Sequence, residues 1–376
     1  MLVKFLFSNF LSINKTQEFT MLANKTRKNS ERIYKAKNIK LTKCKAVFGA
    51  NASGKSNLVE AFQFVQDMVE DGLPRGFSEK YFRLSEKNKI LPSKFEAELL
   101  IHDKRYLYGF SVVLNTGTIQ NEWLYEISTT GIKKNIYERD LERKEFVTGD
   151  HFKNADVIGK IRDYGCDTID QDDKLFLTIL NQVFSKLIIE NTELKIFKNI
   201  YDWFVFKLTI SNPSTILTGY PYFTDSNLHE IAELLNALGT GISDLQFIDV
   251  PDEVVRHKIP DKLYIKITTD LEKQNVKAKK SKKYRAPSVM IRGLKEFYIF
   301  EIDENNNIST KTIEFNHEKN FVFFELKEES DGTARLLDLI EILFKVSSDS
   351  VYVIDEIDRC LHPIMTEKLI GLFLEM

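Results

Sequence analysis

The sequence predicts an α/β fold with a mostly parallel sheet, an antiparallel side sheet and a helical insertion. First, a glycine-rich segment at residues 49–56 follows a short apolar run and precedes apolar residues at helical spacing. Second, the apolar run S-V-Y-V-I at residues 350–354 ends in two carboxylates, as a parallel strand does where it opens into a ligand crevice. Third, residues 94–128 alternate apolar and polar side chains, which is typical of an antiparallel sheet.

The glycine-rich segment, G-A-N-A-S-G-K-S, matches the P-loop pattern G-x-x-x-x-G-K-[ST]. The run A-V-F at residues 46–48 indicates a strand before it, and a helical pattern follows it until Gly72 and Pro74. The apolar residues of that pattern are Leu58, Phe62, Val65 and Val69. Strand, glycine loop and helix form the order that a phosphate-binding loop requires.

A loop of this kind points backbone N–H groups at phosphate oxygens from a helix N-terminus, whose dipole favours anions. We expect Lys55 to bridge the β- and γ-phosphates of a nucleotide and Ser56 to place its hydroxyl on Mg²⁺. The residues expected to bind the nucleotide here are Gly49, Asn51, Ala52, Ser53, Gly54, Lys55, Ser56 and Asn57. The alternative is a glycine and serine turn that only caps a helix.

The two carboxylates after the late strand, Asp355 and Glu356, complete the predicted site. We expect Asp355 to hold the magnesium shell through water, together with Ser56, and Glu356 to orient or deprotonate the attacking water. Lys55 and Glu356 are therefore the expected catalytic residues. The alternative is a strand that is merely capped by acidic residues.

A helix is expected just before that strand. Ser330 is a natural N-cap, and Gly332 leaves the backbone open to close approach. The apolar residues that follow at helical spacing are Leu336, Leu337, Leu339, Ile340, Leu343 and Phe344. This is the arrangement of an ABC-type signature, whose helix N-terminus, here Ser330, Gly332 and Thr333, is offered to the γ-phosphate bound by another subunit. The alternative is an ordinary amphipathic helix.

Three segments carry a resemblance to a known group. G-A-N-A-S-G-K-S-N-L, S-D-G-T-A-R-L-L-D-L and V-I-D-E-I-D-R-C-L-H-P resemble the P-loop, signature and Walker B segments of bacterial ABC-like ATPases of the AAA-family ATP-binding protein group. These are relatives of the ATPase parts of OLD-family nucleases and of ATPases in retron-linked, Septu-like and abortive-infection anti-phage systems. The opening M-L-V-K-F-L-F-S-N-F-L-S-I and the segment L-L-N-A-L-G-T-G-I-S-D-L are similar to the group's first strand and middle.

The resemblance implies a P-loop NTPase of ABC-ATPase type that binds and hydrolyses ATP with Mg²⁺. It also implies a homodimer or higher oligomer in which ATP is sandwiched between head-to-tail subunits, so that Ser330 of one chain meets nucleotide held by Lys55 of the other. The implied role is that of a sensor or clamp in bacterial anti-phage defence or DNA transactions, working with a nuclease or toxin effector. The alternative is a non-hydrolysing scaffold, in which ATP only joins two subunits and presents a partner.

Some positions depart from the group's pattern. His362 resembles the OLD-type histidine that replaces a D-loop aspartate, and a surface histidine is the alternative. Gln63 and Gln66 follow the P-loop directly, so we expect packing or surface roles and not that of a Q-loop glutamine.

In the group, a switch histidine and the last core strands follow the helix expected at residues 365–376. We therefore expect a C-terminally incomplete core that further residues or a second polypeptide complete.

The expected domains are an ABC-like core at residues 1–150 and 261–376 and a helical insertion at residues 151–260. Within the insertion, residues 173–206 and 226–238 have helical patterns, the second ended by Gly239. Residues 263–324 return to strand-like patterns around a charged loop.

The composition of the chain argues against several classes of protein. A net charge of −2 over 376 residues excludes a uniformly basic nucleic-acid coat. Three distant cysteines argue for a reducing compartment and against zinc. No apolar run is long enough to span a membrane, so we expect a cytoplasmic protein without a membrane partner. Basic runs at residues 24–40 and 277–285 are compatible with nucleic acid as a partner, and a solvated loop is the alternative.

Overall fold

The computed structural model describes two compact units. The described residues are all except 25–31, 37–38, 150, 184, 186–187, 189–190, 213–223, 281–283, 285, 294, 319–321, 345–349 and 376. Unit 1 comprises Met1–Ile210 and Ser348–Asp355, and unit 2 comprises Ser211–Ser347 and Glu356–Met376. Each unit is therefore built from two separate stretches of the chain.

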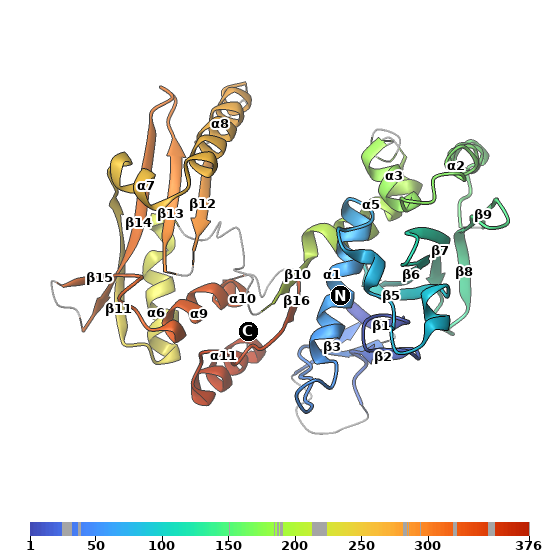
Figure 1. Ribbon diagram of the computed structural model, residues 1–376, viewed down its shortest axis with the longest axis horizontal. Coiled ribbons are helices and arrows are strands. Elements are labelled where there is room, and N and C mark those ends of the chain that lie inside the picture. Colours follow the sequence, from blue (N-terminus) through green and yellow to red (C-terminus); the bar gives the residue numbers. More distant parts are fainter. Residues whose placement is uncertain are drawn as a thin grey trace. The chain divides into compact units, whose positions relative to one another are not determined.

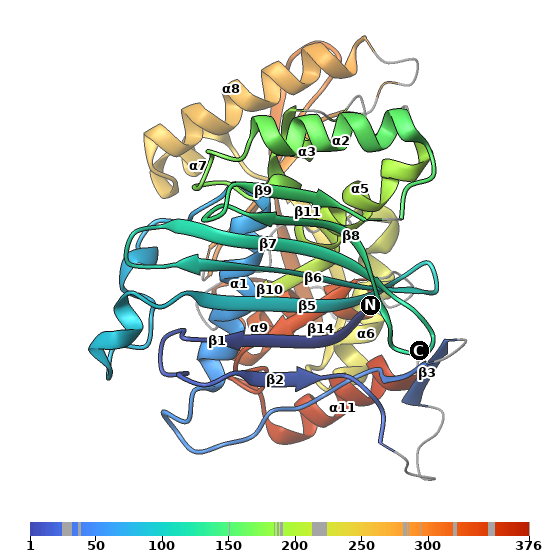
Figure 2. The same cartoon turned by 90° about the vertical axis from the view of Figure 1, so that its right-hand side faces the viewer.

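Unit 1 is built on a seven-stranded sheet of order β2-β1-β5-β6-β7-β8-β9, which Figure 2 shows as successive ribbons. All its strand pairs are antiparallel. The strands are β1 (Leu2–Ser8), β2 (Gln17–Thr20), β5 (Ser93–Ile101), β6 (Lys104–Val113), β7 (Thr118–Ile127), β8 (Lys133–Asp140) and β9 (Glu145–Thr148). The antiparallel sheet predicted from residues 94–128 is confirmed as β5, β6 and β7. Gly117, at φ 77°, lies in the tight turn between β6 and β7, where glycine adopts a left-handed conformation without a steric penalty.

The predicted helix after the P-loop segment is confirmed as α1 (Lys55–Glu70). Its apolar face packs on one face of the sheet, where the rings of Phe62 and Phe5 stack at 4.0 Å between centroids. The other face is partly covered by the hairpin of β3 (Ile33–Ala36) and β4 (Ile39–Thr42), whose Leu41 packs with Val3. The sheet is thus covered on both faces near β1.

Several helices of unit 1 lie before or after the strands β5–β9 along the chain. They are η2 (Phe77–Glu79) and η3 (Glu86–Lys89) between α1 and β5, and then α2 (Ala155–Asp167), α3 (Phe176–Val183), η4 (Thr192–Leu194), α5 (Lys195–Asp202) and the π-helix η5 (Trp203–Lys207). The predicted helical character of residues 173–206 is confirmed for most described residues of that range. Strand β10 (Leu208–Ser211) then pairs with β16 (Val351–Ile354), which returns from far along the chain.

Unit 2 is a second antiparallel sheet between helices, with the strand order β11-β14-β13-β12 and with β15 beside β14 (Figure 1). The strands are β11 (Ile242–Asp249), β12 (Ser288–Arg292), β13 (Phe297–Ile302), β14 (Ile308–His317) and β15 (Phe323–Glu325). The helices are η6 (Asp225–Asn227), α6 (Leu228–Leu238), α7 (Asp252–Lys258), α8 (Asp261–Ala278), α9 (Asp331–Leu339), α10 (Glu341–Phe344) and α11 (Pro363–Glu375). Gly239, at φ 95°, ends α6 as predicted.

The strand-like prediction for residues 263–324 is wrong over its first part, which is helix α8. Leu263 and Ile265 are exposed, whereas Tyr264, Ile267 and Leu271 are buried at helical spacing against β13. The apolar run therefore looked like a strand because it carries apolar side chains on both the buried and the exposed face. The strands of this range begin at β12.

The mostly parallel sheet is not confirmed, because every strand pair whose register is described is antiparallel. The predicted domain limits at residues 150 and 261 stay a prediction. Residues 151–260 contribute helices to both compact units, and they also contain β10 and β11.

Candidate nucleotide-binding site

The predicted phosphate loop turns directly into α1, whose first residue is Lys55. Gly54 has φ 92° and Ala52 has φ 62°, so both lie in the left-handed region. A Cβ on Gly49 would lie 2.6 Å from Ser53 Oγ, and one on Gly54 would lie 3.1 Å from Ser12 Oγ. The left-handed backbone thus favours glycine at Gly54, whereas a side chain at Gly49 would require Ser53 to move.

Lys55 folds back over the loop. Its Nζ donates to the carbonyls of Gly49, at 2.8 Å, and of Ala50, at 3.0 Å. An ammonium has three donors, and two of them are used in this way. The backbone of the loop and the one cation of the motif thus converge on the N-terminus of a 16-residue helix, where the helix dipole favours anions.

The remaining loop residues lie around this point. Asn51, Ala52, Ser53 and Ser56 are exposed, and Asn57 is half-buried. The strand predicted to end at Phe48 is wrong, because residues 44–50 are not in a strand and the last strand before the loop is β4. Phe48 is 91% exposed and Val47 is 47% exposed, so their apolar character does not place them in the core.

Asp355 follows β16 directly and is buried. Within unit 1, α1 contacts β16, and Val351 and Val353 pack against the unit's core (Figure 1). The strand that leads to Asp355 and the helix that begins at Lys55 are therefore neighbours. Residues Val351–Ile354 are each half-buried, with β10 as the paired strand, so the prediction of a strand buried on both faces is wrong.

The oxygens of Ser56 and Asp355 suit Mg²⁺ chemically. Among the described residues, no group of three or more His, Cys, Asp or Glu side chains is placed to hold a metal ion. Magnesium bound with a nucleotide needs only one or two protein oxygens, because phosphates and water supply the rest of its shell. A serine hydroxyl and a carboxylate in one unit fit that requirement.

Glu356 begins a tight turn in unit 2. It is exposed and has φ 48°, and Cys360 in the same turn has φ 62°. The carbonyl of Glu356 accepts a hydrogen bond from Arg359 N at 3.0 Å. Left-handed conformations at residues other than glycine cost about 1–3 kcal/mol each and gather at functional sites. The backbone at the predicted general base is therefore strained.

Ser330 caps α9 as predicted. Its Oγ accepts a hydrogen bond from Thr333 N at 3.0 Å and lies 2.9 Å from Thr333 Oγ1. A Cβ on Gly332 would lie 2.8 Å from the carbonyl oxygen of Cys360. The predicted signature helix is thus packed, within unit 2, against the turn that begins with Glu356.

Charged pairs surround the start of α9. Lys295 Nζ lies 2.8 Å from Asp331 Oδ1 and donates to the carbonyl of Glu329 at 2.9 Å. The hydrogen bond from Lys295 lowers the pKa of Asp331, so this first-turn side chain is a carboxylate at neutral pH. Glu329 Oε1 also pairs with His317 Nε2 at 2.8 Å.

His362 and the two glutamines have hydrogen-bond partners within their own units. His362 is exposed, and its carbonyl and Nδ1 accept hydrogen bonds from the first turn of α11. Gln66 Nε2 donates to the carbonyls of Phe204 and Leu208, both at 2.7 Å, which joins α1 to the π-helix. Gln63 donates to Asp67 within α1. The packing role expected for Gln66 is therefore confirmed.

The basic runs are only partly described. Lys277, Lys279 and Lys280 are exposed at the end of α8, and residues 281–283 and 285 lie outside the described part of the chain. Tyr284 donates to Asn275 Oδ1 at 2.8 Å. In the earlier run at residues 24–40, residues 25–31 and 37–38 are also outside the description.

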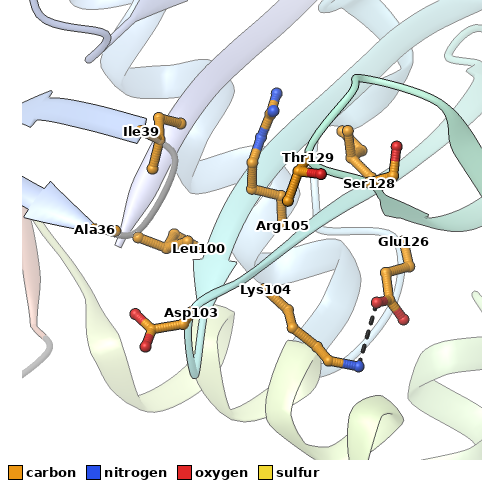
Figure 3. A pocket seen from close by; sticks show the side chains of 10 residues that line it. Ala36, Ile39, Leu100, Asp103, Lys104, Arg105, Glu126, Ser128 and Thr129 are labelled. Atoms are coloured by element: carbon orange, nitrogen blue, oxygen red, sulfur yellow. Dashed lines mark ion pairs between the residues drawn. The ribbon is translucent and has the colours of Figure 1, made fainter.

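A pocket elsewhere in unit 1 contains no predicted site residue. It is lined by the ends of β5, β6 and β7, including Leu100, Lys104, Arg105 and Glu126 (Figure 3). Lys104 and Glu126 pair with each other at 3.2 Å, and Arg105 pairs with Glu98 at 2.6 Å. The charged groups of Lys104, Arg105 and Glu126 are thus paired within the protein.

A family model described as "AAA domain, putative AbiEii toxin, Type IV TA system" matches residues 46–162 and 220–376, well over half of the chain. The chain belongs to this AAA-domain family. Membership makes it an α/β protein with an AAA-type P-loop ATPase domain. The first matched segment contains Lys55, and the second contains Ser330 and Asp355. A search of curated proteins finds no match. None of the helices among the described residues combines the length and the apolar composition that a membrane span requires.

Sequence reasoning missed one residue at the loop. Ser12 Oγ accepts a hydrogen bond from Asn57 Nδ2, although the two residues are far apart in the chain. Ser12 is one of several polar residues in the opening segment, and nothing in the sequence reveals which residue it contacts.

Proposed function

We propose that this AAA-family chain is an ABC-like ATPase that binds Mg-ATP on residues 49–57 and hydrolyses it. The observation that carries the proposal is the geometry of the loop: Gly54 is left-handed, α1 starts at Lys55, and the Lys55 ammonium lies over the loop carbonyls. This arrangement has the donors and the charge that a triphosphate needs. The neighbouring strand that leads to Asp355 supports the same assignment.

Each residue has a proposed role. The loop N–H groups and Lys55 bind the β- and γ-phosphates, and the oxygens of Ser56 and Asp355 hold Mg²⁺, which neutralises charge on the phosphates when bound. Glu356 orients the water that attacks the γ-phosphate. In an ATP sandwich of two head-to-tail chains, the start of α9, with Ser330, Gly332 and Thr333, is offered to the nucleotide of the other chain.

The proposed context is bacterial defence. The family description names a toxin of a type IV toxin–antitoxin system, which supports an ATP-driven sensor or clamp that works with a nuclease or toxin effector. The proposal includes a cytoplasmic location, a homodimer or higher oligomer, a mostly parallel nucleotide sheet in the assembled core, and kinship with OLD, retron and Septu ATPases.

The first test is nucleotide binding. Lys55→Ala should abolish Mg-ATP affinity in isothermal titration calorimetry, because the phosphates lose the one cation of the loop. Lys198→Ala is the matched control, since Lys198 is an exposed lysine paired with Asp202 one helical turn away. Equal affinities of the wild type and Lys55→Ala would contradict the P-loop assignment.

The second test separates hydrolysis from scaffolding. In a single-turnover assay, the wild type should release phosphate from bound ATP, and Glu356→Gln should bind ATP but release phosphate at least about a hundredfold more slowly. A wild-type chain that binds ATP and dimerises without releasing phosphate would instead support the non-hydrolysing scaffold.

A further inference from the structure

The turn between β1 and β2 contacts the phosphate loop from outside the motif. Asn57 Nδ2 donates to Ser12 Oγ, and a Cβ on Gly54 would lie 3.1 Å from the same oxygen. All three residues belong to unit 1. The hydroxyl of Ser12 therefore stands beside the last glycine of the loop, next to the start of α1.

Hydrogen bonds of two buried asparagine side chains hold this turn in place. The side chain of Asn9 donates to the carbonyls of Asn88, at 2.9 Å, and Leu91, at 2.8 Å, and accepts from Asn88 Nδ2 at 2.9 Å. Asn9 and Asn88 are both buried. Further along the turn, Leu11 N donates to the carbonyl of Lys80 at 2.6 Å. Buried polar groups satisfied to this degree fix one conformation.

The backbone of the turn is strained. Asn9 has φ 52° and Leu11 has φ 49°, and the left-handed region is uncommon for a bulky residue such as leucine. Phe10 lies between them and is fully buried against Phe64 and Phe95. Such strain persists only where the surroundings over-determine it, and it is found at ligand clamps and active sites.

The chemistry of the hydroxyl then decides its role. A serine hydroxyl has one donor and two acceptor lone pairs, and the contact with Asn57 uses one acceptor. We propose that Ser12 donates its O–H to a phosphate oxygen of the nucleoside triphosphate bound on residues 49–57, with Asn57 orienting the hydroxyl. The inference rests on the proposed function and adds Ser12, on the turn between β1 and β2, to the nucleotide site.

The test measures Mg-ATP affinity by titration calorimetry. Ser12→Ala should raise the Kd about tenfold or more, because a hydrogen bond to a charged group is lost. Ser12→Thr keeps the hydroxyl at an exposed position and should stay within about twofold of the wild type. Asn14→Ala is the matched control, because Asn14 accepts from Asn88 at 2.9 Å and removing that bond loosens the turn without touching Ser12.

Four outcomes are distinguishable. A Kd raised in Ser12→Ala but not in Asn14→Ala, with unchanged thermal midpoints for Ser12→Ala, supports the proposal. Equal affinities of the wild type and Ser12→Ala overturn it, as does an equal loss in Asn14→Ala, which would assign the effect to the stability of the turn. A wild-type chain without Mg-ATP affinity overturns the proposed function as well.

A double-mutant cycle tests the link to Asn57. If Asn57 orients the hydroxyl, Ser12→Ala and Asn57→Ala should be non-additive, and the double variant should bind Mg-ATP about as weakly as the weaker single variant. Additive losses would mean that Asn57 does not act through Ser12 and would overturn that part of the proposal.

Discussion

At the scale of single residues, Gly332 in the predicted signature helix has no room for a side chain. Because a Cβ there would lie 2.8 Å from the Cys360 carbonyl, Gly332→Ala must move either the start of α9 or the turn that begins with Glu356. We expect this variant to lose about 1–3 kcal/mol of stability and at least about tenfold in phosphate release, a barrier change of about 1.4 kcal/mol. Mg-ATP affinity should fall less than in Lys55→Ala, because the phosphate loop itself is in unit 1.

Gly371 provides the control. It lies inside α11 with nothing within 4 Å of its Cβ position, so Gly371→Ala should gain about 0.5–1 kcal/mol from the better helix propensity of alanine. Thermal denaturation and a steady-state phosphate assay compare the two variants. If Gly332→Ala were as stable and as active as Gly371→Ala, the packing of α9 against the turn would contribute to neither stability nor phosphate release.

At the scale of elements, Glu122 on β7 ties α3 to the sheet. Its side chain is fully buried and accepts from Phe176 N, at 2.6 Å, and Leu177 N, at 3.1 Å, at the start of α3. Tyr108 and Tyr137 donate to it as well, and burial raises the pKa of both tyrosines well above their usual range, so they remain donors. The carboxylate is therefore an N-terminal cap supplied by a distant strand.

Removing that charge should destabilise unit 1. Arg139 is buried 3.7 Å from Glu122, and an uncompensated buried charge costs about 3–5 kcal/mol. Glu122→Gln should therefore lower the free energy of unfolding by about 3 kcal/mol. Urea unfolding followed by tryptophan fluorescence reports this unit, because both tryptophans, Trp123 and Trp203, belong to it.

The matched control lies on the neighbouring strand β8. Glu138 accepts from Tyr125 OH at 2.7 Å and is exposed, so Glu138→Gln removes a similar contact in water and should cost less than about 1 kcal/mol. A loss in Glu122→Gln no larger than in Glu138→Gln would contradict the capping role.

Elements with local signals could be predicted from the sequence. Helices α1 and α6 each have one apolar face and a glycine at one end, Gly54 and Gly239 respectively, and α9 has its N-cap at Ser330. Helix α8 was missed because apolar residues occupy both its faces, although Pro260 before Asp261 was an available start signal. The exposed position of Phe48 and the partner of Ser12 could not be predicted, because both depend on tertiary packing between distant segments.

At the scale of the whole molecule, the two halves of the proposed ATP sandwich belong to different compact units. The phosphate loop is in unit 1, and the helix capped by Ser330 is in unit 2. If Ser330 acts on nucleotide held by a second chain, Glu356→Gln should accumulate as an ATP-bound dimer, because binding persists while water activation is lost. Light scattering after gel filtration, with and without Mg-ATP, measures this.

The double variant Lys55→Ala/Glu356→Gln provides the comparison. It should remain in the nucleotide-free state of assembly under both conditions, since it cannot hold the phosphates. Glu356→Gln with the same mass in the presence and absence of Mg-ATP would argue against the sandwich and would leave the P-loop assignment intact.

The return of β16 to β10 has a consequence for synthesis on the ribosome. Unit 2 is encoded largely between these two strands, so unit 1 cannot acquire Asp355 until nearly all of unit 2 has been translated. Roughly 300 residues separate Ser56 from Asp355, which corresponds to about 15–60 s of translation. A nascent chain therefore carries its phosphate loop long before it carries the carboxylate proposed for magnesium.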